Sequence, residues 1–173
     1  MEAECYVKNR RLLPVYQRHY QAHDQELDQH GEGAAHPLDA ALQAALGMHN
    51  GMLSSAGIAL KTDTPFDQDG ERKNPWWGDP SYRILSKTAT QADVRLYHLH
   101  IDPSYAEQDL NCLFPLQHLQ EMETIGRIGR ISPRHYSIMG YLLNPENLLC
   151  KTVPALIRNL KEDLADVVVL VPA

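Results

Sequence analysis

The stretch "DVVVLVPA", Asp166–Ala173, decides the fold. Five consecutive apolar residues run from Val167 to Val171, and four of them are β-branched. Such a run predicts a buried strand of a parallel sheet. Because ligands and catalytic groups in open α/β sheets collect at the carboxyl ends of the strands, we expect the functional residues of this protein near Ala173.

Three further stretches have the apolar content of strands. They are "GMLSSAGIAL" (51–60), which predicts a strand and a turn, "SYRIL" (81–85), and the alternating "DVRLYHLHID" (93–102). The segment 62–80 between the first two is polar and rich in Pro, Gly and Asp, which predicts a long loop. Long loops inside compact domains are often functional.

Helix signals separate the later strands. Pro115 suits the first turn of a helix, an apolar residue recurs at every third position over 116–125, and Gly126 is a suitable end. A second helix is expected after Asn144, with a kink or break at Pro154. Strands alternating with helices predict an α/β fold in three layers, with a mainly parallel open sheet of the Rossmann or flavodoxin kind.

The chain of 173 residues has the length of one domain, but its beginning differs in composition. Residues 1–45 are rich in Gln, His and charge, with weak helical spacing, and predict a helical N-terminal arm. The α/β domain is then expected over 46–173. No internal repeat interrupts it.

Charge and composition exclude several functional classes. Sixteen basic against twenty-two acidic residues give a net charge of −6, which disfavours nucleic-acid binding. No apolar run is long enough to span a membrane, and the start of the chain lacks the apolar region of a signal peptide. We therefore expect a cytoplasmic protein. Its three widely spaced cysteines favour neither a disulfide framework nor a zinc site.

The first candidate for chemistry is "YHLHID". Residues two apart share a face of a strand, so His98, His100 and Asp102 would project together. Two imidazoles and a carboxylate can transfer protons, with the carboxylate orienting a histidine, or can bind a metal ion. The plainer alternative is one hydrogen-bonded core histidine and one surface histidine.

Two other segments carry weaker signals. In "DLNCLFP", Asp109 or Asn111 can cap a helix, or help to bind a substrate at the helix start. In "SPRHYSIMG", the adjacent His135, Tyr136 and Ser137 cannot all face one way in an extended segment, and no nucleophile elbow surrounds the serine. The sequence also lacks glycine-rich nucleotide-binding motifs.

Seen together, these segments resemble the selenoprotein B family of the glycine, sarcosine, betaine and D-proline reductases. The resemblance covers about two thirds of the chain, roughly from Ser54 to Ala173. Residues 1–45 add no motif to it. The motifs that carry it, in order, are "SSAGIAL", "PFD", "GDPSYRIL", "HLHID", "DLNCLFPLQHLQEM", "GRIGRISPRHYSIMGY" and "LADVVVLVPA".

The resemblance implies a redox function. In that family a strand like "DVVVLVPA" is followed at once by selenocysteine or cysteine, which serves in the reductive cleavage of a carbon–nitrogen bond in a small amino-acid-like substrate. His98, His100 and Asp102 would be catalytic beside it. Asp109, Asn111, His135, Tyr136 and Ser137 would bind substrate, and no metal is expected. Electrons would come from a thiol donor.

The resemblance also implies partners and raises a question about the chain end. Larger complexes of the family pair this subunit with a pyruvoyl-containing subunit, and we expect partner reductase subunits and a homo-oligomer here. Selenocysteine is encoded by UGA, so we expect that the sequence ends at a UGA meant for that residue. Two alternatives stay open: a binding or regulatory subunit without the redox residue, and a metal-dependent enzyme using His98, His100 and Asp102.

Overall fold

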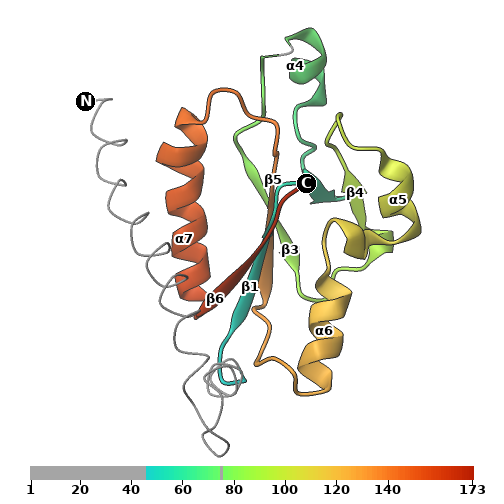
Figure 1. Cartoon of the computed structure of the whole chain (residues 1–173). Helices are drawn as coiled ribbons and strands as arrows, with labels where there is room; N and C mark the ends of the chain where they lie inside the picture. The colour runs from blue at the N-terminus through green and yellow to red at the C-terminus, as the bar shows by residue number, and fades with distance from the viewer. Residues whose placement is uncertain (1–45, 75) are drawn as a thin grey trace, which may run out of the picture. The chain divides into compact units, whose positions relative to one another are not determined.

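The structure, a computed structural model, describes residues 46–74 and 76–173. The strands are β1 (Asn50–Ser54), β2 (Ile58–Leu60), β3 (Tyr82–Ser86), β4 (Val94–Leu96), β5 (Arg134–Ile138) and β6 (Val167–Val171). Four of them form a sheet in the order β3-β5-β1-β6, and β2 pairs with β4 in a separate small sheet (Figure 1). The predicted helical arm at 1–45 lies outside the described residues.

Three of the four strands in the main sheet are parallel. β1 pairs in parallel with both β5 and β6, whereas β3 joins β5 in antiparallel orientation. The register aligns Ser54 of β1 with Val171 of β6 and with Ser137 of β5. The carboxyl ends of β1, β5 and β6 therefore meet at one edge of the sheet, and the predicted mainly parallel sheet is confirmed.

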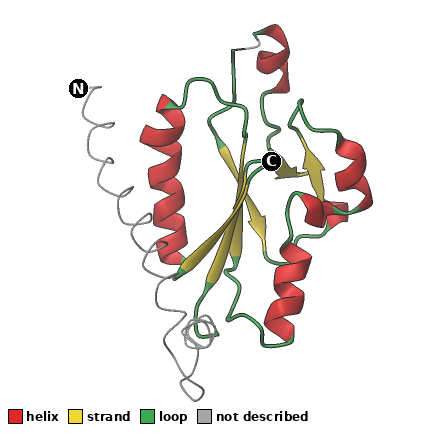
Figure 2. Cartoon of the chain, viewed as in Figure 1, coloured by secondary structure: helices red, strands yellow, loops and turns green. Residues whose placement is uncertain are grey.

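Helices lie on both faces of this sheet. Figures 1 and 2 show α7 on one side and α6 on the other, which gives the three layers expected from the sequence. The small sheet and α5 lie beyond β3 on the side of α6. The helices are α4 (Gln68–Lys73), α5 (Pro103–Gln108), α6 (Leu116–Thr124) and α7 (Val153–Glu162), with short 3-10 turns at Gln91–Asp93 (η1) and Leu110–Cys112 (η2) and a π-helical stretch at Leu148–Thr152 (η3).

The core lies between the sheet and α6. Met52 of β1 and Leu85 of β3 are fully buried there, and they pack against Phe114 and the inner residues of α6, Leu116 and Leu119. Burying apolar area of this kind is the main source of folding free energy. On the other face of the sheet, α7 packs closely against β1. A Cβ added to Gly51 of β1 would lie only 2.9 Å from Leu160 Cδ2 of α7.

The predicted helix boundaries are confirmed. The side chain of Asn144 accepts a hydrogen bond from the amide of Glu146, where the last helical segment begins. The π-helical stretch comes directly before Pro154, which lacks the amide that a regular helix would need. At the end of α6, Gly126 has a φ of +67°, the left-handed conformation that glycine adopts most readily.

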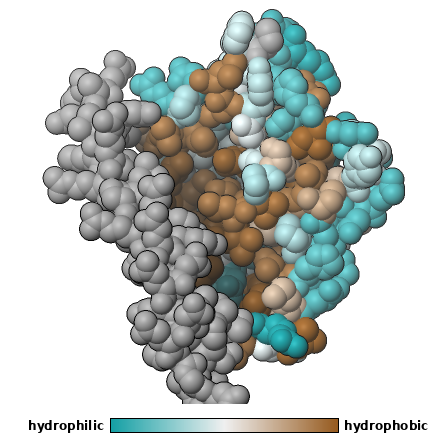
Figure 3. All heavy atoms as spheres, viewed as in Figure 1, coloured by the Kyte–Doolittle hydropathy of each residue, from teal (hydrophilic) through white to brown (hydrophobic). Residues whose placement is uncertain are grey.

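Three expectations about elements were wrong in part. β4 ends at Leu96, so the strand predicted over 93–102 stops before its histidines. The polar segment 62–80 contains the helix α4. β6 is parallel as predicted but forms an edge of the sheet, so Leu170 is 68% exposed rather than buried. Figure 3 shows apolar residues gathered on the side of the molecule that faces the viewer.

The apolar stripe predicted over 116–125 is only half buried. Leu116 and Leu119 enter the core, whereas Met122 and Ile125, at the end of α6, are exposed. Among the described residues, no helix is both long and apolar enough to cross a membrane.

Candidate functional site

Three distant parts of the chain lie together where the parallel strands β1, β5 and β6 reach their carboxyl ends. The amide of Ala173 donates to Ser55 Oγ at 2.9 Å, directly after β1 and β6 have ended. Gly140, just after β5, is required at this point, since an added Cβ would lie 2.8 Å from the carbonyl oxygen of Ser55 and 3.1 Å from that of Ala173. The three strand ends are therefore closely packed, as expected for a site at this edge.

The two histidines of "YHLHID" reach this edge by a turn. Gly57 accepts a hydrogen bond from the amide of Tyr97, and an added Cβ at Gly57 would lie 3.3 Å from the amide nitrogen of His98. The chain then turns, so that the amide of His100 donates to Nδ1 of His98 at 3.2 Å, and the ring centroids lie 5.8 Å apart. The sequence correctly placed the rings together, but through a turn rather than a strand face.

The two histidines differ in environment. His98 is buried, and this burial, followed by the charge of His100, lowers the pKa of His98 below its usual 6.5. A neutral imidazole with Nδ1 already accepting a hydrogen bond is thus favoured at position 98. The His100 side chain is 54% exposed and lies against Tyr141, with ring centroids 4.4 Å apart. His100 is therefore the more accessible of the pair.

Glu71, which the sequence analysis did not select, completes the group. Its carboxylate oxygen Oε1 lies 3.0 Å from Nε2 of His100, although the residue is only 5% exposed. The same oxygen accepts no hydrogen bond within the described part of the chain, so the contact with His100 is an ion-pair contact without hydrogen-bond alignment. Together Glu71, His98, His100 and Tyr141 form the edge cluster.

Local signals explain how α4 carries Glu71 into this cluster. Asp67 caps the helix by accepting from the amide of Gly70 at 2.8 Å. The side chain of Gln68 donates to the carbonyl of Tyr97 at 2.6 Å, which fastens α4 to the strand that leads into the histidine turn. A capping Asp, acidic residues in the first turn and basic residues in the last are the usual signature of a helix, and this signature could have revealed α4.

Asp102 has a structural role. Its side chain accepts from the amide of Ser104 at 2.9 Å and caps α5, and this hydrogen bond lowers the pKa of the Asp102 carboxyl. The expectation that Asp102 projects with the two histidines from one strand face was wrong, since the strand ends at Leu96. No three acidic, histidine or cysteine side chains gather into a possible metal site over 46–74 and 76–173.

The segment with Asp109 and Asn111 lies at the same edge. Asp109 Oδ1 accepts from the amide of Asn111 at 2.9 Å and from its side chain at 2.8 Å, and the first of these bonds lowers the pKa of the Asp109 carboxyl. Ser54 Oγ donates to the carbonyl of Leu113 at 2.8 Å, which ties this segment to the end of β1. Both residues are accessible, but their side chains bond mainly to each other.

His135, Tyr136 and Ser137 lie inside the sheet on β5, and none of them belongs to the edge cluster. Ser137 Oγ accepts from the amide of Ile58 at 2.8 Å, and the Tyr136 hydroxyl donates to Asp163 at 3.0 Å. His135 is fully buried with no hydrogen bond to either ring nitrogen, and burial lowers its pKa to about 4. Each of the three is thus placed as a core residue.

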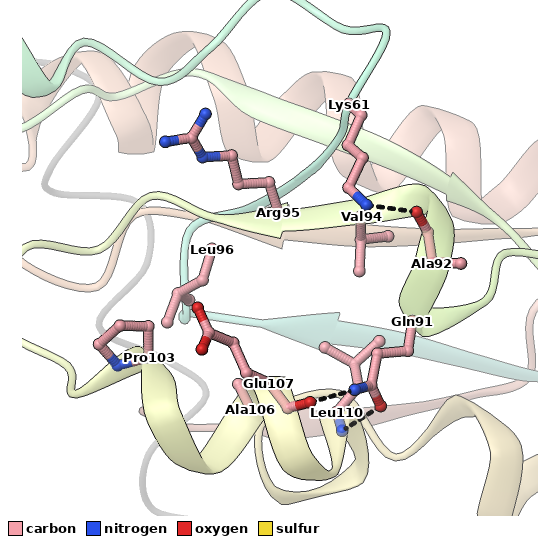
Figure 4. A pocket seen from close by; sticks show the side chains of 10 residues that line it. All are labelled: Lys61, Gln91, Ala92, Val94, Arg95, Leu96, Pro103, Ala106, Glu107 and Leu110. Atoms are coloured by element: carbon pink, nitrogen blue, oxygen red, sulfur yellow. Dashed lines mark hydrogen bonds between the residues drawn. The ribbon is translucent and has the colours of Figure 1, made fainter.

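A groove of about 690 Å³ lies away from the edge cluster, between β4 and α5 (Figure 4). Lys61 donates to the carbonyl of Ala92 at 2.6 Å, and the Gln91 side chain donates to the backbone carbonyl of Glu107 and accepts from the amide of Leu110. The charged side chains of Arg95 and Glu107 also line the groove.

Comparison with known proteins supports the resemblance at a coarse level. No family model and no solved structure matches the chain. The chain is 27% identical over 119 residues to D-proline reductase subunit gamma of Acetoanaerobium sticklandii. The alignment covers 69% of this chain but 46% of that protein, so the chain spans less than half the length of the relative. The similarity is thus to a subunit of a multi-subunit reductase.

Proposed function

We propose that the chain is a selenoprotein B-like subunit of a reductase of the glycine, sarcosine, betaine or D-proline type, which cleaves a carbon–nitrogen bond in a small amino-acid-like substrate. The observation that carries this proposal is the edge cluster. Two histidines and a buried carboxylate meet next to Tyr141, which follows Gly140 and its close approach to the carbonyl of Ala173. The carboxyl ends of parallel strands are where α/β enzymes collect their catalytic groups. The similarity to a D-proline reductase subunit supports the same reaction class.

The redox group of this proposal is a selenocysteine or cysteine directly after Ala173. When present, it supplies the nucleophile and the electron pair for cleavage of the carbon–nitrogen bond, and a thiol donor restores it. The amide of Ala173 is held by Ser55, and its carbonyl lies against Gly140, so the residue that follows would start from a fixed position. A fixed position favours reaction, because it removes the cost of orienting the reacting groups.

The histidines of the edge cluster would manage protons. Cleavage of the carbon–nitrogen bond leaves a nitrogen that must take up a proton, and His100 is accessible and charged when protonated, with Glu71 beside it. His98 would fix the turn that presents His100, because its Nδ1 accepts from the amide of His100. General acid catalysis of this kind contributes roughly 10²- to 10⁴-fold to a rate.

Asp109 and Asn111 would contribute to substrate binding at the same edge. His135, Tyr136 and Ser137 are not part of the proposed site, because they are buried within β5. We further propose a partner subunit of the reductase, with a pyruvoyl group in such a partner, and self-association of this subunit. These proposals rest on the family resemblance and on the multi-subunit nature of the relative.

The test begins with the gene downstream of the Ala173 codon and the mass of the protein isolated from its native host. An in-frame UGA or cysteine codon, with a longer product, is expected. The isolated protein with its bound subunits should then reduce one of D-proline, sarcosine, betaine or glycine with dithiothreitol, and from D-proline it should form 5-aminopentanoate. His100→Gln should lower kcat by at least about 100-fold.

Two outcomes would overturn the proposal. A closed reading frame and a 173-residue mature protein would remove the redox residue and leave the alternative of a binding or regulatory subunit. A longer product that carries the redox residue, with all its subunits bound, but reduces none of the four substrates would place the protein outside this reaction class.

A further inference from the structure

We propose that the carboxylate of Glu71 binds the protonated amine of the substrate, and that His100 covers this carboxylate until the amine displaces it. This inference rests on the proposed function and names the group that recognises the substrate nitrogen. The ligand class is a primary or secondary ammonium ion with at least one N–H donor, which fits glycine, sarcosine and D-proline among the proposed substrates and excludes betaine.

The state of Glu71 carries the inference. A buried carboxylate is normally satisfied by several hydrogen bonds, because removal of its water is costly. Glu71 is 5% exposed, yet its Oε1 accepts no hydrogen bond in the described part of the chain. An unsatisfied buried acceptor in a native structure calls for a ligand, an ion or a catalytic role.

The surroundings of this oxygen allow a ligand to reach it. The only group at ion-pair distance within the described residues is His100, whose side chain is about half exposed and can turn toward solvent. The contact lacks hydrogen-bond alignment, so no hydrogen bond breaks when the ring moves away. A small N–H donor could then take the place of Nε2 beside the Glu71 carboxylate.

Charge selects the class of ligand. A desolvated carboxylate attracts a cation and repels the carboxylate of an amino acid, so the nitrogen end of the substrate would face Glu71. The nearby cation Arg83 does not compete, since its guanidinium donates to the carbonyls of Thr64 and Pro65 and lies near Asp79. A metal ion would need further ligands, and none is grouped there within 46–74 and 76–173.

The exchange would also place the proton donor. Once the ammonium occupies the Glu71 carboxylate, the displaced His100 ring remains on the same short turn, beside His98 and Tyr141. When the carbon–nitrogen bond breaks, the ammonium nitrogen keeps the bonding electron pair and leaves as a neutral amine. The imidazole would then lie next to this amine and could donate the proton that returns it to the ammonium form. Binding and proton delivery would thus be coupled through one residue.

The experiment is an NMR titration of the full chain, with ¹⁵N-labelled histidine and His100 assigned through His100→Gln. The probe is pyrrolidinium, a secondary ammonium in a five-membered ring, and its matched control is tetrahydrofuran, which has the same shape without charge or N–H. We expect a saturable shift of the His100 ring signals with pyrrolidinium and none with tetrahydrofuran. Tetramethylammonium, a cation without N–H, should bind more weakly than pyrrolidinium.

Two variants on α4 distinguish specific binding at Glu71 from a general effect of negative charge. Glu71→Gln keeps the size of the side chain and should weaken pyrrolidinium binding by at least about tenfold. Asp69→Asn removes an equal charge from an exposed neighbour on α4 that pairs with the exposed Arg72, and it should leave binding unchanged. If Glu71→Gln does not fold, the comparison of pyrrolidinium with tetrahydrofuran on the unchanged protein still shows whether the site near His100 binds an ammonium ion.

Equal shifts from pyrrolidinium and tetrahydrofuran, or binding that Glu71→Gln leaves intact, would overturn the inference. Its failure can be told apart from failure of the proposed function. Amine binding at Glu71 in a protein without reductase activity would contradict the proposed function alone. Reductase activity without amine binding at Glu71 would contradict this inference alone.

Discussion

Two charged clusters lie at opposite ends of the parallel strands, and they differ in how well their polar atoms are satisfied. At the amino end, Arg134 binds Asp163 through two nitrogens, at 2.8 and 2.9 Å, and also contacts Glu162. Asp163 in addition accepts from the Tyr136 hydroxyl. At the carboxyl end, Glu71 is as buried as Asp163. Among the described residues its carboxylate has one ion-pair contact, to His100, and its Oε1 accepts no hydrogen bond.

This difference indicates that the cluster at Arg134 stabilises the fold, whereas the edge cluster serves ligand binding. The network at Arg134 joins β5 to the end of α7, and its atoms satisfy one another, so it has the properties of a stabilising device. The edge cluster keeps unused hydrogen-bonding capacity at the edge where ligands bind in α/β folds. Unsatisfied polar groups are costly, and at the carboxyl ends of the strands this cost points to function. His135 also has unsatisfied nitrogens, but it is enclosed in the sheet, where no ligand reaches it.

The largest expected effect comes from breaking the satisfied cluster. Asp163→Ala would leave Arg134 and the Tyr136 hydroxyl without their main partner, and we expect a loss of about 4 kcal/mol in the free energy of unfolding. Urea denaturation measures it. Glu162→Gln serves as the control, because this exposed contact should contribute less than about 1 kcal/mol. Equal losses from the two variants would contradict the comparison.

Acid should reveal a second structural group, His135. Its pKa of about 4 in the folded protein lies below its usual 6.5, because burial disfavours the charged ring, so the unfolded chain takes up the proton first as pH falls. Unfolding free energy should therefore decrease by about 3 kcal/mol between pH 6.5 and pH 4. The lowered pKa of His98 acts in the same direction.

The control for this pH dependence is His135→Leu. Leucine at this buried position removes both the titration and two unsatisfied nitrogens. Denaturation curves of the variant should therefore change less with pH than those of the unchanged protein over the same range. Parallel curves would show that other groups cause the acid sensitivity.

Replacement of Glu71, unlike replacement of Asp163, should not lower the free energy of unfolding by much. Because its buried Oε1 has no hydrogen-bond partner over 46–74 and 76–173, replacement by the neutral amide in Glu71→Gln should change the unfolding free energy by less than about 1 kcal/mol, or increase it. Thermal or urea denaturation measures this change. A loss as large as that of Asp163→Ala would assign Glu71 to the structural class and remove the contrast between the two clusters.

The smallest expected effect tests Asp102. As the cap of α5, it should tolerate Asp102→Ser, since serine also accepts a hydrogen bond from a helix amide, whereas Asp102→Ala should lower the melting temperature slightly. Neither change should alter amine binding at Glu71. A loss of activity in Asp102→Ser with an unchanged melting temperature would instead support the catalytic role expected from the sequence.

Much of the fold followed from local patterns. The apolar run Val167–Val171, the segment "SYRIL" and the helix signals at Pro115 and Asn144 each act over a few residues, and the structure places strands and helices at or next to them. The exposure of Leu170 did not follow, because burial of a strand depends on whether it is central or at an edge. The Rossmann or flavodoxin likeness stays a prediction.

The candidate site was predictable only in part. The spacing of His98 and His100 indicated a shared location, and the two rings are neighbours, but the strand that was expected to hold them ends earlier. Asp102 was selected by spacing and is occupied as a cap, because helix starts compete for the same residue types as active sites. Glu71 carried no signal of its own within a polar stretch.

The sequence by itself determined the α/β class, the parallel strand before Ala173 and the family that the motifs resemble, since these depend on residue order and local periodicity. Only the tertiary structure decided that Glu71 meets His100, and that His135, Tyr136 and Ser137 lie buried away from this edge. The physical reason is that hydrogen-bond satisfaction and burial arise between segments far apart in the chain, which no local pattern records.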